Sequence, residues 1–208
     1  MTLEYSSILI EDYETNAAII RSILLSPKDY VRIEDDYHPD EYRMGMFLGP
    51  LNFTSYYLEA GATNLAFDCK PQRWLKSGEE PMSFLGSPYT DAGSNITSYK
   101  LAIANNTYFD SKPLIHFEGK GKIEFTFSHP AGSCRMTLDT PTDEIGDYYI
   151  DSELQDCYKL VDGEKVSANS LLTVDEFPLL RSGITATSQI RTDTTINTLT
   201  ITPRWFIL

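Results

Sequence analysis

The chain of 208 residues contains few cysteines and few histidines. Its three cysteines, Cys69, Cys134 and Cys157, form no Cys-x-x-Cys pair, which favours packed, reduced thiols over a metal or redox centre. The three histidines do not have the spacing of a zinc motif, and no glycine loop of the phosphate-binding type occurs. The sequence therefore predicts no metal site and no cofactor, and the reduced thiols favour folding in a cytosol.

Positive charge is also scarce. The chain has 17 Lys and Arg against 30 Asp and Glu, a formal net charge of -13, which disfavours binding to nucleic acid or to an anionic membrane surface. No run of 18 apolar residues and no basic-then-apolar leader occurs, so neither a membrane span nor a secretory signal is predicted. With 41% hydrophobic residues, the sequence is that of a soluble globular protein.

One segment near the N-terminus has helical periodicity. Thr15 or Asn16 can cap a helix there, and Ser26-Pro27 can end it. Between them, apolar residues recur every three or four positions: Ala17, Ile20, Ile23 and Leu24. We expect this to be the one helix of the chain.

Most of the remaining sequence has the pattern of short strands. Residues 123–127 alternate apolar and polar, residues 148–158 are expected to form one further strand, and Asp162-Gly163 is a hairpin signal. Residues 79–92 are rich in Gly and Pro with little periodicity, as in a linker. The predicted fold is mainly β: a partial α+β domain with one helix over residues 1–78, a linker over 79–92, and a β-sandwich over 93–208.

The acidic residues of region 147–156 raise the question of catalysis. On a single strand, Asp147, Asp151 and Glu153 would share a face, and a pair of carboxylates can hydrolyse glycosidic bonds. Acidic residues are also ordinary on the solvated face of a sandwich, and no serine nucleophile elbow is present. We predict that the chain is not an enzyme, with a glycoside hydrolase that uses Asp151 and Glu153 as an alternative.

The last residues of the chain, Trp-Phe-Ile-Leu, are strongly apolar and are expected to be docked. Trp205, and Trp74 in the first half of the chain, each follow an arginine near a proline. Tryptophan in this setting more commonly closes a core than stacks on a sugar. We therefore predict that Trp74 and Trp205 fix the ends of the domains.

Residues 30–43 are polar and rich in charge. Their acidic residues lack the central glycine and regular spacing of a calcium loop. We predict instead that the stretch is either a solvated cluster of charges or a contact with another subunit, to which Arg32 and Arg43 would contribute.

Several separate stretches resemble the distal tail protein family of siphophages, the long-tailed bacterial viruses. The stretches follow the family's order along nearly the whole chain: 20–27, 30–35, 37–43, 67–78, 111–115, 118–121, 150–153, 157–158, Asn169, 177–179 with Gly183, and 201–205.

The resemblance implies a belt domain that forms a hexameric ring, followed by a galectin-like β-sandwich. It implies a structural protein of the virion tail, folded in the cytoplasm of the bacterial host. This protein would be a hub that joins the tail tube protein to the tail-tip protein and the receptor-binding protein. Its partners would thus be further copies of itself and these tail proteins.

The sequence differs from the family in two ways. Family members usually have more sequence ahead of the part that residues 3–12 match, so a belt domain without its first strands is expected. The His-x-Asn-Pro-Arg string that galectins use for sugar is missing. A carbohydrate-binding sandwich that contacts the host cell wall remains the alternative function.

Overall fold

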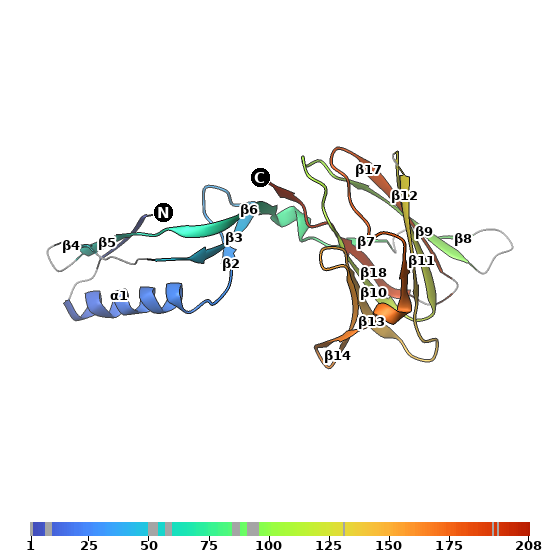
Figure 1. Cartoon of the computed structure of the whole chain (residues 1–208), viewed down its shortest axis with the longest axis horizontal. Helices are drawn as coiled ribbons and strands as arrows, with labels where there is room; N and C mark the ends of the chain where they lie inside the picture. The colour runs from blue at the N-terminus through green and yellow to red at the C-terminus, as the bar shows by residue number, and fades with distance from the viewer. Residues whose placement is uncertain are drawn as a thin grey trace. The chain divides into compact units, whose positions relative to one another are not determined.

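A computed structural model describes residues 2–6, 10–49, 54–56, 60–84, 88–90, 96–130, 132–192, 194 and 196–208. The chain divides into two compact units, the first comprising residues 1–73 with Leu208 and the second comprising residues 74–207. Within the described residues the structure is mainly β with one helix, as predicted (Figure 1). No described helix has the length and apolar character needed to cross a membrane.

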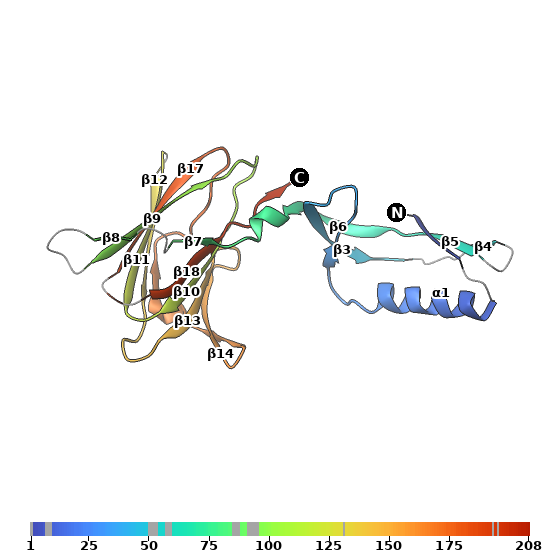
Figure 2. The ribbon, with the colours of Figure 1, turned by 180° about the vertical axis from the view of Figure 1, so that it is seen from behind.

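The first unit holds one helix and two groups of strands. The helix α1 spans Ile10–Leu25. The strands β1 (Thr2–Ser6), β5 (Ala60–Asn64) and β4 (Thr54–Tyr56) form one antiparallel sheet. The strands β2 (Val31–Ile33), β3 (Glu41–Phe47) and β6 (Phe67–Leu75) follow one another in a second sheet. Figure 2 shows α1 running alongside these strands.

The helix differs from its prediction at the N-terminal end. It ends at Leu25, directly before Ser26-Pro27 as expected, but it begins at Ile10 rather than at Thr15 or Asn16. Glu11 and Glu14 have high helix propensity, and Thr15 and Asn16 lie within the helix rather than at its start. Of the predicted apolar face, Ala17 is buried, whereas Ile23 is 63% exposed.

The second unit is a β-sandwich of two antiparallel sheets, which can be followed in Figure 1. In one sheet the strand order is β15 (Glu164–Ser167), β14 (Asp156–Val161), β13 (Gly146–Asp151), β10 (Leu114–Gly119), β18 (Ile196–Thr202) and β7 (Met82–Ser83). In the other the order is β16 (Leu172–Val174), β12 (Gly132–Asp139), β11 (Lys122–His129), β17 (Thr185–Thr192), β9 (Thr97–Ala104) and β8 (Pro88–Thr90). Two short 3₁₀ turns lie at Lys76–Gly78 and Asn169–Leu171.

The core of the sandwich consists of every second residue of these strands. Ile123, Phe125 and Phe127 of β11 are at most 2% exposed, which confirms the alternation predicted for residues 123–127. They pack with the inward residues of the opposite sheet, such as Ile115 and Leu199. Burial of this many large side chains is the main stabilising contribution to the second unit.

Two predicted segments have a different form in the structure. Residues 148–158 form two strands, β13 and β14, because Gln155 adopts a positive φ of 54° in a turn between them. Within 79–92, the predicted linker, β7 pairs with β18 and β8 pairs with β9, and the following Phe84 is 2% exposed in the core. Asp162-Gly163 forms the predicted hairpin turn, with φ of 54° and 83°.

The end of the chain is a short strand. β19 (Phe206–Ile207) pairs with β6, whose last residues, Trp74 and Leu75, belong to the second unit. The Leu75 N–H donates to the Trp205 carbonyl at 2.9 Å. The chain end is thus docked as predicted up to Ile207, although the last residue, Leu208, is 58% exposed.

Candidate functional site

An Arg–Asp ion pair in the second unit holds residues 203–205 against the sandwich; we refer to residues 203–205 as the latch. The Arg204 guanidinium donates to both carboxylate oxygens of Asp151, with Nη1 to Oδ1 at 2.7 Å and Nη2 to Oδ2 at 2.9 Å. Asp151 ends β13, and its side chain is 5% exposed. A bidentate Arg–carboxylate pair in a buried position fixes geometry as well as charge.

Burial opposes ionisation of Asp151, but the hydrogen bonds from Arg204 and from the backbone of Leu154 and Glu153 outweigh it. The pKa of Asp151 therefore lies below its ordinary value. The carboxylate is charged at neutral pH and has no role as a proton donor there.

This lowered pKa predicts a specific loss of stability in acid. A carboxylate with a depressed folded-state pKa stabilises the protein above its unfolded pKa of about 3.9, and the stabilisation is lost as pH falls through the folded pKa. The difference in unfolding free energy between the natural chain and Asp151→Asn is expected to be largest above about pH 4 and to shrink below it. Urea unfolding from about pH 2.5 to 7 measures this, and a difference independent of pH would contradict it.

Backbone contacts complete the latch. Arg204 has a positive φ of 60°, and its N–H donates to the Gly78 carbonyl at 2.7 Å. The Ser111 hydroxyl donates to the Pro203 carbonyl at 2.7 Å. A Cβ on Gly78 would lie 2.2 Å from the backbone N of Trp205, so only glycine permits this approach.

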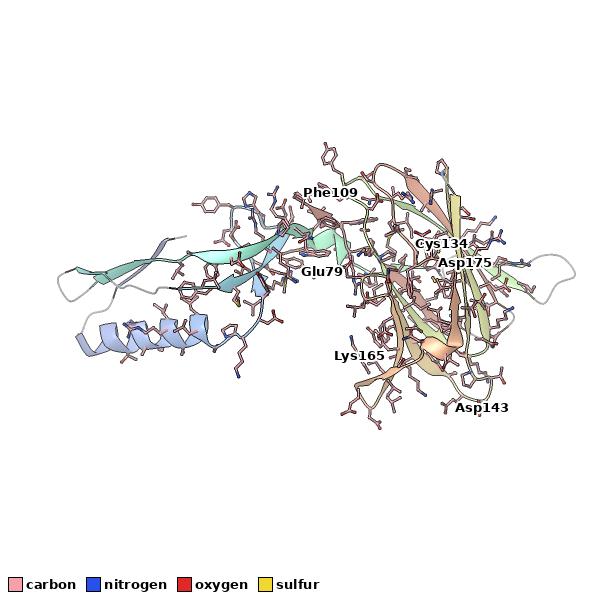
Figure 3. The ribbon with its side chains drawn as sticks, viewed as in Figure 1. Glu79, Phe109, Cys134, Asp143, Lys165 and Asp175 are labelled. Carbon is pink, nitrogen blue, oxygen red and sulfur yellow. The ribbon has the colours of Figure 1, made fainter. Side chains whose placement is uncertain are left out.

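Trp205 packs against the core of the sandwich as a partly buried residue. Trp74 lies in a separate aromatic group, with its ring centroid 5.4 Å from that of Phe206. Phe206 in turn stacks on Phe109 at 5.5 Å; Phe109 is marked in Figure 3. Both tryptophans thus contact other parts of the second unit, and their role in fixing the domain ends stays a prediction.

Arg32 and Arg43 lie on neighbouring strands of the first unit but on opposite faces. The register pairs Arg32 with Met44 and Ile33 with Arg43, and cross-strand partners share a face. Arg32 Nε lies 2.5 Å from Glu34 Oε1, and its guanidinium carbon lies 3.9 Å from the Tyr42 ring centroid. A subunit contact on one face of this sheet would therefore include one of the two arginines but not both.

The acidic residues of region 147–156 do not share one face. Asp147 and Asp151 belong to β13, Glu153 lies in the following turn, and Asp156 begins β14. Their side chains have different partners: Asp147 contacts His116, Asp151 contacts Arg204, Glu153 contacts Lys112 and Asp156 contacts Asn169. The ionised, arginine-bound Asp151 is unsuited to paired carboxylate hydrolysis with Glu153.

Aromatic and basic side chains form a row across four strands on the outward face of the sheet that contains β10. The ring of His116 stacks on Tyr149 at 4.5 Å, and Tyr149 stacks on Tyr158 at 5.2 Å. Lys165, labelled in Figure 3, places its ammonium 4.2 Å from the Tyr158 ring centroid. His116 Nε2 lies 2.5 Å from Asp147 Oδ1.

This row was missed from the sequence because it depends on the strand register, which places His116 opposite Tyr149 and Tyr149 opposite Tyr158. Each tyrosine has both ring faces covered, Tyr149 by His116 and Tyr158, and Tyr158 by Tyr149 and Lys165. Sugar stacking requires a free ring face. The row therefore favours a stabilised sheet face over a saccharide platform.

The three cysteines are free thiols. Burial and the nearby carboxylates of Glu176 and Asp175 raise the pKa of Cys134 to about 11, and Figure 3 shows Asp175 near Cys134. Burial and Asp156 raise the pKa of Cys157 to about 12. Both thiols are protonated at neutral pH, and no group of three metal-ligating side chains occurs among the residues that the structure describes.

The structure is that of a mainly-β protein in which, along the sequence, a smaller unit with one described helix is followed by a β-sandwich. Among solved structures, the chain is similar to the crystal structure of the SPP1 Dit protein, described as a paradigm of the hub adsorption apparatus in phages that infect Gram-positive bacteria. The similarity has a TM-score of 0.60 and 13% sequence identity, and covers 100% of this chain and 78% of that chain. At this identity the likeness concerns the fold alone.

No protein-family model matches the chain, and no curated protein matches it significantly.

Proposed function

We propose that the chain is a structural subunit of a bacteriophage tail, placed at the distal end as a hub between the tail tube and the tail-tip and receptor-binding proteins. The observation that carries the proposal is the likeness of the whole chain to the SPP1 Dit protein, whose description names a hub of the adsorption apparatus. The order of a helix-bearing first unit followed by a β-sandwich agrees with this role. The residues described above act in packing and assembly rather than in catalysis.

The surface of the first unit supports a role in assembly. Among its described side chains, Ala17 and Leu65 are the buried hydrophobic residues. Large apolar side chains on α1, on β2 and directly after β3 are instead exposed: Ile19 49%, Ile23 63%, Leu25 61%, Val31 40% and Leu48 63%. Exposed apolar groups on this scale favour contact with another protein.

We infer that neighbouring copies of the chain cover these exposed apolar side chains, and that the copies assemble into a hexameric ring.

Light scattering combined with electron microscopy tests the ring. We expect the natural chain to have the mass of a hexamer and to form rings, and Ile23→Glu to reduce the mass to that of a monomer because it places a charge in the apolar contact. Leu154→Glu is the matched control, since Leu154 is 62% exposed but lies in the second unit. A natural chain that stays monomeric at all concentrations would contradict the ring.

Immunogold labelling of purified phage particles tests the placement independently. We expect label at the distal end of the tail, beside the tail tip. Absence of the chain from purified particles would contradict the proposed function whatever the oligomeric state.

A further inference from the structure

The segment 105–110 connects β9 to β10 and presents its side chains alternately inward and outward. Asn105 is 1% exposed and Thr107 is 9% exposed, whereas Tyr108 is 87% exposed. Asn106, between the two buried residues, is also exposed. The segment therefore displays the amide of Asn106 and the phenol of Tyr108, two positions apart in sequence, above the buried side chains of Asn105 and Thr107.

The base is held by a dense set of hydrogen bonds. The Asn105 amide donates to the carbonyls of Phe109 at 2.9 Å and Leu180 at 2.7 Å. Its oxygen accepts from the Thr107 N–H at 2.9 Å and from the Thr107 hydroxyl at 2.7 Å. The Asn105 backbone N–H donates to the Ile184 carbonyl at 3.2 Å, and the Gly183 N–H donates to the Asn105 carbonyl at 2.9 Å.

The neighbouring segment 181–183 fixes the other side of the loop. Ser182 donates from its N–H to Asp110 Oδ1 and from its hydroxyl to the Thr107 carbonyl, both at 2.8 Å. Arg181 approaches Asp110 at 3.9 Å. Phe109 is held by its stack on Phe206. The contacts of the residues on both sides thus fix the backbone of the loop at Tyr108.

A rigid loop that displays an exposed tyrosine is suited to recognition. Ordering a loop on binding costs conformational entropy, and a loop ordered beforehand avoids that cost. Tyrosine, asparagine, serine and glycine are the residues that binding loops on β-sandwiches favour, because tyrosine provides a large, stiff contact and the others provide hydrogen bonds. Tyr37, which is 92% exposed, lies in a loop where Asp35 accepts from the N–H groups of Tyr37 and His38 and the Glu41 N–H donates to the His38 carbonyl.

We propose that the loop 105–110 is a preformed docking loop for a second tail protein. The partner would offer a concave apolar pocket that takes the Tyr108 ring, with a polar group in reach of the phenol or of Asn106. Arg181 and Asp110, each 41% exposed, would lie at the rim of the contact. The proposal rests on the proposed function and names the part of the sandwich that holds the neighbouring protein.

The chemistry of the loop favours a protein over a saccharide. A saccharide site needs several convergent hydrogen-bonding groups beside an aromatic ring. Here the polar side chains of Asn105, Thr107, Asp110 and Ser182 are engaged within the loop region itself. A single aromatic anchor with a polar rim is the arrangement of a protein–protein hot spot.

Cryo-electron microscopy of purified tails tests the proposal directly. We expect density of a different protein against residues 105–110 in each copy of the chain. Particles in which the chain is present but the loop faces solvent would overturn the docking loop and leave the proposed function intact. Particles that lack the chain would overturn both.

Variants measure the contribution of Tyr108. Against the purified neighbouring protein that the map identifies, we expect Tyr108→Ala to weaken binding by roughly thirtyfold or more in calorimetry. Tyr108→Phe keeps the ring and removes the hydroxyl, so it measures the contribution of the hydroxyl alone. Tyr37→Ala is the matched control, and we expect it to bind as the natural chain does. Because Tyr108 is so exposed, Tyr108→Ala should keep the natural melting temperature.

Two results would contradict the proposal. Equal affinity of Tyr108→Ala and the natural chain would overturn the role of the ring. Binding of the natural chain to a glycan array that is abolished by Tyr108→Ala and retained by Tyr37→Ala would assign the loop to a saccharide instead.

Discussion

Replacing Arg204 with alanine is expected to lower the unfolding free energy of the second unit by ~3–5 kcal/mol, because removing one member of a buried ion pair leaves the other charge uncompensated. The remaining charge would be that of Asp151, whose side chain is 5% exposed. The substitution also removes two charge-assisted hydrogen bonds of 2.7 and 2.9 Å. Urea unfolding followed by tryptophan fluorescence measures the effect, since Trp74 and Trp205 both lie in this unit.

Lys112→Ala provides the control for this prediction. Lys112 and Glu153 form an ion pair at 3.2 Å in the same region, but their side chains are 45% and 52% exposed. Loss of an exposed pair costs about 0–1 kcal/mol. If Arg204→Ala lowered the unfolding free energy by no more than Lys112→Ala does, the pair of Arg204 and Asp151 would not be what stabilises the latch.

Trp205→Ala is expected to destabilise the second unit by ~3 kcal/mol, the lower end of the range for removing a large aromatic side chain, because Trp205 is only partly buried. The indole packs against the core of the sandwich, and its removal leaves a space there. Thermal and urea unfolding of the purified variant measure the loss.

Leu208→Ala is the matched control at the chain end, since Leu208 is 58% exposed and should change stability by no more than about 0.5 kcal/mol. The double variant Arg204→Ala with Trp205→Ala should lose less than the sum of the single losses, because both residues hold the same segment. Natural stability in Trp205→Ala would show that the docking of the chain end does not depend on this side chain.

Local patterns in the sequence predicted the parts of the fold that local chemistry determines. The alternation over residues 123–127 gave the inward face of β11, and Asp162-Gly163 gave a hairpin turn because both residues tolerate positive φ. The turn between β13 and β14 was missed because Gln155, an uncommon residue at positive φ, provides it. Phe84 was assigned to a linker because the surrounding glycines and prolines obscure the short strand β7.

The candidate sites depend on contacts between distant residues, which explains why the sequence indicated only part of them. Asp151 was noted as an acidic residue, but its partner Arg204 lies 53 positions away. The importance of Tyr108 follows from the burial of Asn105, and that burial depends on contacts with residues 180–184. Arg32 and Arg43 lie on opposite faces because of the strand register, and their role in a subunit contact stays a prediction.

The exposed apolar side chains of α1 affect how stable a copy of the chain is before it assembles. If contact with neighbours buries Ile19, Ile23 and Leu25, the stability of the first unit follows mass action and increases with subunit concentration. Newly made chains at low concentration would then open there first, and a protease would remove the unassembled copies while the assembled ones resist cleavage. Proteolysis would in this way limit the number of copies that do not assemble.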